Sequence, residues 1–194
     1  MRFAMVICLL LIAALGHAAD TRVVRVGDFN RGVNGSGVIV SKDGYILTAF
    51  HVVSEPQNLG VRLADGREFW ATGVAFDSAT DLALLKIAAH DLVPVRFAAA
   101  LPGISVTIVG YVGLQEIRKE AHVVAIDGKG FRRSDLVVTD VEPIPGMSGG
   151  PMLNDRGEVV GINLMRWMPR DKRLTPTGAG ANVEQVQRLL RRSM

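Results

Sequence analysis

The amino-acid sequence predicts an all-β protein whose strands form two halves, closed by a single C-terminal α-helix. Short β-branched runs separated by turn signals recur along the chain, and we count about twelve of them. A stretch rich in Ala and Pro with weak periodicity, residues 88–103, divides them into two halves. Many short strands with few helices are typical of a pair of β-barrels or sandwiches, with about six strands in each half.

Asp-Gly turns mark the expected hairpins of the first half. One turn, residues 41–44, separates strands at 38–40 and 45–47, and Asp65-Gly66 separates strands at 61–63 and 68–70. Further strands of this half are expected at 22–26, 72–76 and 82–87.

The second half has strands expected at 104–109, 121–126, 136–140, 152–153 and 159–160. The closing helix, residues 182–192, begins at Asn182, a good N-cap, with Gln185 three residues later as in a capping box. Its apolar residues share one face, which we expect to pack on the β core: Val183, Val186, Leu189 and Leu190.

Residues 1–18 have the pattern of a secretory signal peptide. Arg2 precedes an apolar run at 6–15, which is too short to span a bilayer comfortably. Small residues Gly16 and Ala18 follow at the spacing that a signal peptidase recognises. We therefore expect cleavage after Ala18, no stable membrane anchor, and export to the periplasm or outside the cell; an uncleaved anchor is the alternative. The one cysteine, Cys8, leaves with this segment, so the mature chain has no disulfide.

Charge and histidine patterns exclude other classes of function. The 22 Lys and Arg against 19 Asp and Glu are mostly scattered, without the basic, aromatic-interleaved stripe of a nucleic-acid binder. The four histidines have no metal-ligand spacing such as His-x-x-x-His. We expect no nucleic-acid partner, no metal and no cofactor.

The segment PGMSGGPML, residues 145–153, holds one hydroxyl among glycines and prolines. It fits a tight turn between strands. It also fits a loop that presents Ser148 beside convergent backbone N–H groups, as nucleophilic acyl transfer requires.

A serine nucleophile needs a base that titrates near neutral pH and a carboxylate that orients this base. His51 ends one apolar strand and Asp81 opens another, so each also fits a purely structural role. Asp77 has the same chemistry in a more turn-like setting, which makes it the natural control. Together Ser148, His51 and Asp81 supply one group of each kind, and their chain order places the site between the two halves.

At these residues the chain resembles the trypsin-like serine proteases of the HtrA/Deg family. The similar blocks, in order, are "GSGVIVSKDGYILTAFHVV" (35–53), "DSATDLALLKI" (77–87), "TDVEPIPGMSGGPMLNDRGEVVGIN" (139–163) and "GAGANVEQVQRLL" (178–190). The resemblance implies one protease domain, residues 19–194, with barrel one at about 20–90 and barrel two at about 104–181. The fold would be a trypsin-like double six-stranded β-barrel with a C-terminal helix.

The resemblance also implies the site and the activity. The triad would be His51, Asp81 and Ser148, with the oxyanion hole on the N–H groups of Gly146 and Ser148. The function would be serine endopeptidase action on polypeptides through an acyl-enzyme intermediate. The alternative is a catalytically silent trypsin-like module that binds peptides, which would be expected to have a broken triad or oxyanion loop.

The chain departs from the family in several respects. Met147 stands where the family often has Asn, although the mechanism does not require its side chain. Members usually carry PDZ domains after the protease, and we expect the protease domain only. The N-terminal arm, about 19–33, is too short to imply the family's trimer, which leaves the oligomeric state open.

Substrate recognition is expected at two segments. Glu142 stands six residues before Ser148, where trypsin-like folds have the floor of the pocket for P1, the residue before the cut bond. Its carboxylate either selects a basic P1 residue or points outward without effect. Ile162, Asn163 and Leu164 are expected to pair with the substrate backbone as an added strand, and loop 165–177 to wall the cleft.

Overall fold

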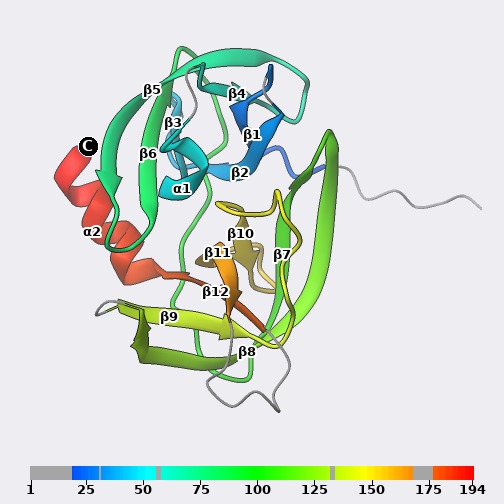
Figure 1. The fold of residues 1–194 in the computed structure, drawn as a ribbon, viewed down its shortest axis with the longest axis vertical. Helices are drawn as coiled ribbons and strands as arrows, with labels where there is room; N and C mark the ends of the chain where they lie inside the picture. Colours follow the sequence, from blue (N-terminus) through cyan, green and yellow to red (C-terminus); the bar gives the residue numbers. More distant parts are fainter. Residues whose placement is uncertain (1–18, 31, 56–57, 132–133, 168–176) are drawn as a thin grey trace, which may run out of the picture.

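The computed structural model describes residues 19–30, 32–55, 58–131, 134–167 and 177–194 (Figure 1). The predicted signal peptide, residues 1–18, lies outside the described residues. The described chain forms two closed antiparallel β-barrels of six strands each, with one C-terminal helix. The all-β, double-barrel prediction is therefore confirmed.

The first barrel has the strand order β1-β2-β3-β6-β5-β4. Its strands are β1 (Val23–Asp28), β2 (Val33–Ile39), β3 (Tyr45–Ala49), β4 (Gly60–Arg62), β5 (Glu68–Asp77) and β6 (Leu82–Ile87). Both Asp-Gly hairpins form, and the turns use the positive φ that glycine permits, +99° at Gly44 and +90° at Gly66.

The second barrel closes in the order β10-β11-β12-β9-β8-β7. Its strands are β7 (Ser105–Val112), β8 (Gln115–Phe131), β9 (Ser134–Thr139), β10 (Pro151–Leu153), β11 (Val159–Trp167) and β12 (Thr177–Asn182). The connection between the barrels, residues 88–104, contains no strand, but Phe97 forms a bridge to Val159 and fastens it to β11.

Two helices accompany the barrels. The C-terminal helix α2 (Val183–Ser193) begins with the predicted capping box: the Gln185 backbone N–H donates to the Asn182 side chain, and the Asn182 backbone N–H donates to the Gln185 side chain. Although α2 follows the second barrel, it lies against β5 and β6 of the first (Figure 1). A one-turn helix, α1 (Phe50–Val53), follows β3 and was not predicted. No described helix has the length and hydropathy of a membrane span.

A shared core joins the two barrels. The largest buried cluster combines first-barrel side chains with Val109, Ile162 and Leu164 of the second barrel and with Val186 and Leu189 of α2. Each of these is at most 7% exposed. The groups carried by the loops between the barrels are thus held on one packed body.

Candidate active site

His51 and Asp81 lie side by side at the inner ends of two paired strands. In the antiparallel pair β3–β6, Ala49 stands opposite Leu82, so the residues just beyond each end meet. His51 Nδ1 lies 2.7 Å from Asp81 Oδ2, and the His51 backbone N–H donates to Asp81 Oδ1 at 2.9 Å. The turn α1 aims the ring, and the Phe50 N–H donates to the Asp81 carbonyl at 2.9 Å. The carboxylate therefore fixes both the ring and the backbone of His51.

The two side chains differ in exposure. The Asp81 side chain is 16% exposed, whereas that of His51 is 48% exposed. Asp81 has a φ of +56°, a left-handed conformation that Asp tolerates better than most residues. Such backbone conformations persist where the surroundings over-determine them, which is frequent at functional sites.

Asp77, the control carboxylate, has a different setting. Its Oδ1 accepts the N–H groups of Ala79 at 3.0 Å and Thr80 at 3.2 Å. It therefore caps the turn that leads from β5 to β6, as its sequence setting indicates.

The serine loop, which we define as residues 144–150, curls through two glycines with positive φ. Gly146 has a φ of +101° and Gly149 a φ of +86°. A Cβ at Gly146 would approach the Tyr111 carbonyl oxygen to 2.5 Å, and one at Gly149 would approach the Ser36 carbonyl oxygen to 2.1 Å. Only glycine fits at either position, for reasons of conformation and of space.

The curl divides the N–H groups of this loop into two sets. Three of them bond within the fold: Met147 to the Ile144 carbonyl, Gly149 to that of Asn163 and Gly150 to that of Met147. Within the described part of the chain, the N–H groups of Gly146 and Ser148 donate no hydrogen bond. The two donors left available are thus the two predicted for the oxyanion hole.

Ser36 ties the serine loop to the first barrel, a role that sequence reasoning missed. Its backbone N–H donates to the Ser148 carbonyl at 2.7 Å, and its hydroxyl donates to the Gly146 carbonyl at 2.8 Å. The same hydroxyl accepts the Tyr111 N–H at 2.7 Å. In the sequence, a Ser between two glycines indicates only a flexible strand. The one signal for the anchoring role of Ser36 was its position in the block that contains His51.

The Ser148 hydroxyl donates to the Leu164 carbonyl at 3.2 Å. Among the described hydrogen bonds, none joins this hydroxyl to His51. A hydroxyl has one proton, so Ser148 has to release the Leu164 carbonyl before it can donate to His51. Catalytic hydrogen bonds are often loose without substrate.

The predicted substrate-binding segment of β11 is only partly accessible. Ile162 pairs with Pro151 on one side and with Ala181 on the other. Asn163 exchanges backbone hydrogen bonds with the Gly149 N–H and the Gly150 carbonyl. The strand pairing shifts between Asn163 and Met165, so Leu164 is the first residue whose carbonyl turns toward Ser148. Residues 165–167, expected in a loop, continue β11, and 168–176 lie outside the described residues.

Glu142 is half-buried beside the serine loop. Its carbonyl oxygen accepts a hydrogen bond from Lys119 Nζ at 2.7 Å. A cation from β8 therefore stands next to the expected floor of the P1 pocket, which the sequence did not indicate.

No group of three or more His, Cys, Asp or Glu side chains in the described ranges is arranged to hold a metal ion. The groups brought together by the fold are an imidazole bonded to a carboxylate, a hydroxyl in a tight loop, and two available N–H donors. Such a set can perform acyl transfer by nucleophilic attack.

The chain is similar to known proteases over much of its length. A family model described as a trypsin-like peptidase domain matches residues 35–162. A "Probable periplasmic serine endoprotease DegP-like" of Marinomonas sp. is 43% identical over 135 residues, 66% of this chain and 29% of that protein. The protein of the same name from Chlamydia trachomatis is 36% identical over 145 residues, 68% of this chain and 28% of that protein. The matched region thus spans less than a third of these relatives.

Comparison with solved structures also finds proteases with a similar fold. An HtrA-type protease with tripeptide superimposes with a TM-score of 0.78 at 25% identity, covering 90% of this chain and 60% of that one. The serine endoprotease from Yersinia pestis also superimposes with a TM-score of 0.78, at 28% identity, covering 90% and 63%.

Proposed function

The chain belongs to the trypsin-like peptidase family, with HtrA- and DegP-like relatives, and from this premise we propose that it is a serine endopeptidase. The observation that carries the proposal is the serine loop, in which the only N–H groups left available among the described residues 146–150 are those of Gly146 and Ser148. The hydrogen-bonded pair of His51 and Asp81 supports it.

In the proposed reaction, Ser148 Oγ attacks the carbonyl carbon of the substrate peptide bond while His51 Nε2 takes the hydroxyl proton. The carbonyl oxygen becomes an oxyanion that accepts hydrogen bonds from the N–H groups of Gly146 and Ser148. His51 then gives its proton to the leaving amine, the C–N bond breaks, and an acyl-enzyme remains. Water, activated by His51, hydrolyses this ester and restores Ser148.

Asp81 acts on His51 in two ways. Its Oδ2 accepts a hydrogen bond from Nδ1–H, which keeps the proton on Nδ1 and leaves Nε2 as the basic nitrogen, and its charge stabilises the imidazolium that forms during each proton transfer. The second bond, from the His51 backbone N–H to Oδ1, fixes the backbone of His51 relative to the carboxylate.

Substrate binding follows from the accessible part of β11. The proposal for Ile162, Asn163 and Leu164 narrows to Leu164 and the residues after it, because the backbone groups of the first two are engaged with β10, β12 and the serine loop. A substrate strand that meets the Leu164 carbonyl would place its own carbonyl carbon beside Ser148.

We propose that the protein works after export to the periplasm or beyond, where its relatives are named as periplasmic. Polypeptides are its proposed substrates, in line with the names of these relatives. The rival function, a silent peptide-binding module, requires a broken catalytic set, and the sequence retains all three residues together with the glycines of the serine loop.

Hydrolysis of an unfolded protein such as casein tests the proposal. The mature chain is expected to cut casein internally, and Ser148→Ala is expected to abolish cutting while its circular dichroism spectrum stays unchanged. Ser105→Ala, at the exposed start of β7, serves as the matched control and should remain active. A Ser148→Ala protein that cuts casein at the normal rate would refute the assignment of Ser148 as the nucleophile.

A further inference from the structure

A pocket opens on the first barrel, outside the catalytic set. It encloses about 320 Å³ and is lined by Asp28, Phe29, Asn30, Asn58, Gly60, Glu68, Phe69 and Trp70. These residues come from the end of β1 with its turn, the start of β4 with the loop before it, and the first part of β5. Nothing in the proposed reaction uses them.

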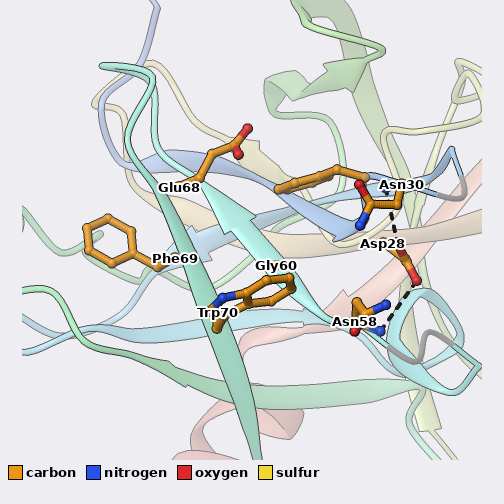
Figure 2. Close-up of a pocket in the computed structure, with 8 residues that line it drawn as sticks. Asp28, Asn30, Asn58, Gly60, Glu68, Phe69 and Trp70 are labelled. Atoms are coloured by element: carbon orange, nitrogen blue, oxygen red, sulfur yellow. Dashed lines mark hydrogen bonds between the residues drawn. The ribbon is translucent and has the colours of Figure 1, made fainter.

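The floor of the pocket is Gly60, and its walls are two aromatic rings. Gly60 pairs with Trp70 across β4 and β5, so both face the same side of the sheet. A Cβ at Gly60 would come within 3.0 Å of the Phe29 ring, which shows that this ring lies over the glycine. Figure 2 shows Trp70 beside Gly60, with Phe69 on the other side of β5. The missing side chain thus makes room for the Phe29 ring, and both this ring and Trp70 line the pocket.

Trp70 is unusual in being 73% exposed. A large aromatic side chain that stands free beside a hollow has apolar area to bury on a ligand. Phe69, in contrast, turns inward and packs against the core of the barrel. The exposed Trp70 ring is therefore not needed for the packing of the barrel itself.

A buried carboxylate holds the two loops that shape the rim. Asp28, 0% exposed, accepts the Asn30 N–H at 3.2 Å through Oδ1 and the Asn58 N–H at 3.3 Å through Oδ2 (Figure 2). The turn after β1 and the loop before β4 are thereby fixed to each other. A preformed rim lowers the ordering cost of binding.

The pocket lies within reach of the serine loop. Ser148 touches β2 at Gly35 and Ser36, and Gly35 pairs with Val26 on β1. Phe29 is three residues beyond Val26, about 10 Å along β1, and β1 lies about 5 Å from β2. Because these two steps are at right angles, Phe29 lies on the order of 11 Å from Gly35, a distance that about three residues of an extended substrate span.

The direction of the substrate follows from the proposed chemistry. His51 must hand its proton to the leaving amine, so the part of the substrate after the cut bond starts against His51 and the first barrel. The part before the cut lies on the other side, at Leu164 of the second barrel. Asn58, on the rim of the pocket, stands seven residues after His51 in the chain, between α1 and β4.

The charges around the pocket favour an apolar occupant. Glu68 pairs with Arg62 at 3.1 Å, and the carboxylate of Asp28 is bound to backbone N–H groups. The Arg25 guanidinium covers the Phe29 ring at 4.4 Å from its centroid. A basic side chain would find these carboxylates already bonded, whereas a flat apolar group gains contact with the Trp70 ring and with the part of the Phe29 ring that Arg25 leaves uncovered.

We propose that this pocket is a specificity subsite for the leaving side of the substrate, where Trp70 and Phe29 hold an apolar, preferably aromatic, side chain of the second or third residue after the cut bond. The inference rests on the proposed endopeptidase function. It makes Trp70 a specificity-determining residue that touches the leaving segment and takes no part in bond cleavage.

The test uses fluorogenic peptides with one acyl-side sequence and with Ala, Phe, Lys or Glu at the second and third positions after the cut. Wild type is expected to show a kcat/KM for Phe about three- to tenfold above that for Ala, the range of an aromatic contact. Trp70→Ala should lose this preference, and Trp70→Phe should keep part of it. Leu101→Ala, an exposed apolar residue (62%) far from the pocket in sequence, is the control and should keep all of it.

A p-nitroanilide with the same acyl side has no residues after the cut bond. Wild type and Trp70→Ala should hydrolyse it at equal rates, which a general folding or catalytic defect would not allow. A Phe preference that survives in Trp70→Ala, or a wild-type preference for Lys, overturns the subsite alone. If wild type hydrolyses neither peptides nor the anilide, the proposed function itself fails.

Discussion

Asp81 bonds both the ring and the backbone of His51, whereas Asp77 bonds only two N–H groups of its own turn. The sequence offered both carboxylates, four residues apart, and their different partners follow from the pairing of β3 with β6. This difference in hydrogen-bond partners predicts different effects on catalysis, which can be compared directly by changing each carboxylate to an amide.

Asp81→Asn is expected to lower kcat by about 10⁴-fold, as in other triads, because the amide favours the wrong tautomer of His51. Asp77→Asn should leave kcat nearly unchanged, since its carboxylate caps a turn. Steady-state kinetics on one peptide, with thermal unfolding as a check on folding, measures both. Equal activities of the two variants would mean that Asp81 is the wrong carboxylate.

The P1 preference should be independent of Glu142. Lys119 Nζ donates to the Glu142 carbonyl, so a basic P1 side chain approaching Glu142 would meet a cation as well as a carboxylate. Of the two alternatives that the sequence left open, we therefore favour the one without a basic preference. Profiling of a P1 peptide library with wild type and Glu142→Ala is expected to give the same ranking. A preference for Lys and Arg that disappears in Glu142→Ala would contradict this view.

At the scale of elements, the capping box of α2 fastens the second barrel's last strand to a helix that packs on the first barrel. Asn182→Ala should lower the free energy of unfolding by about 1 kcal/mol, because Asn182 satisfies the Gln185 N–H at 3.0 Å. Denaturant unfolding of the variant measures the loss. Gln187→Ala, on the exposed face of α2, is the control and should change little. An unchanged midpoint for Asn182→Ala would show that packing alone holds the helix.

Elements with strong local signals were predictable, and those shaped by the surrounding sheet were not. The hairpins at Gly44 and Gly66 and the capped helix were predicted from turn and capping residues. Strand β12 was missed because its Gly and Ala residues have low strand propensity; it exists because β9 and β11 pair with it on both sides. Strands expected at 68–70 and 72–76 form one strand, β5, with a register shift between Gly73 and Ala75.

The same contrast holds for the site. The pairing of His51 with Asp81 was predictable because nucleophilic chemistry needs a base and an orienting carboxylate, and the fold brings these two together. Their catalytic role with Ser148 stays a proposal. The pairing of Ile162 and Asn163 with neighbouring strands was not predictable, because the sequence of a strand does not show which of its edges are already paired. The anchoring role of Ser36 likewise depends on contacts between residues 75 and 110 positions apart.

At the scale of the whole molecule, an N-terminal clamp joins the two barrels. The Asp20 N–H donates to Glu116 Oε2 on β8 at 2.8 Å, and Arg22, held by the Asp20 carboxylate at 2.7 Å, donates to the Gly157 carbonyl at 2.9 Å. Burial alone would raise the pKa of Asp20, but hydrogen bonds from Arg22 and the charges of Arg22 and Arg118 outweigh it, and this pKa lies below its ordinary value.

A lowered folded-state pKa stabilises the protein above the ordinary carboxyl pKa, and this contribution is lost as the pH falls through the folded-state value. Asp20→Asn should therefore cost about 0.5–1 kcal/mol at pH 7, allowing for solvent screening, and progressively less in acid. Urea unfolding at a series of pH values measures this. Asp65→Asn, whose exposed carboxylate bonds only Arg67 in the same turn, should have little effect. A pH-independent loss for Asp20→Asn would refute the linkage.

The central claim is that Ser148 is a nucleophile activated by its surroundings, and labelling of the mature protein with a fluorophosphonate probe tests it most directly. The probe reacts with activated serines, so peptide mapping by mass spectrometry is expected to find one adduct, on Ser148. Labelling should be absent in Ser148→Ala and strongly slowed in Asp81→Asn. An unlabelled wild-type protein, or an adduct on another residue, would contradict the account.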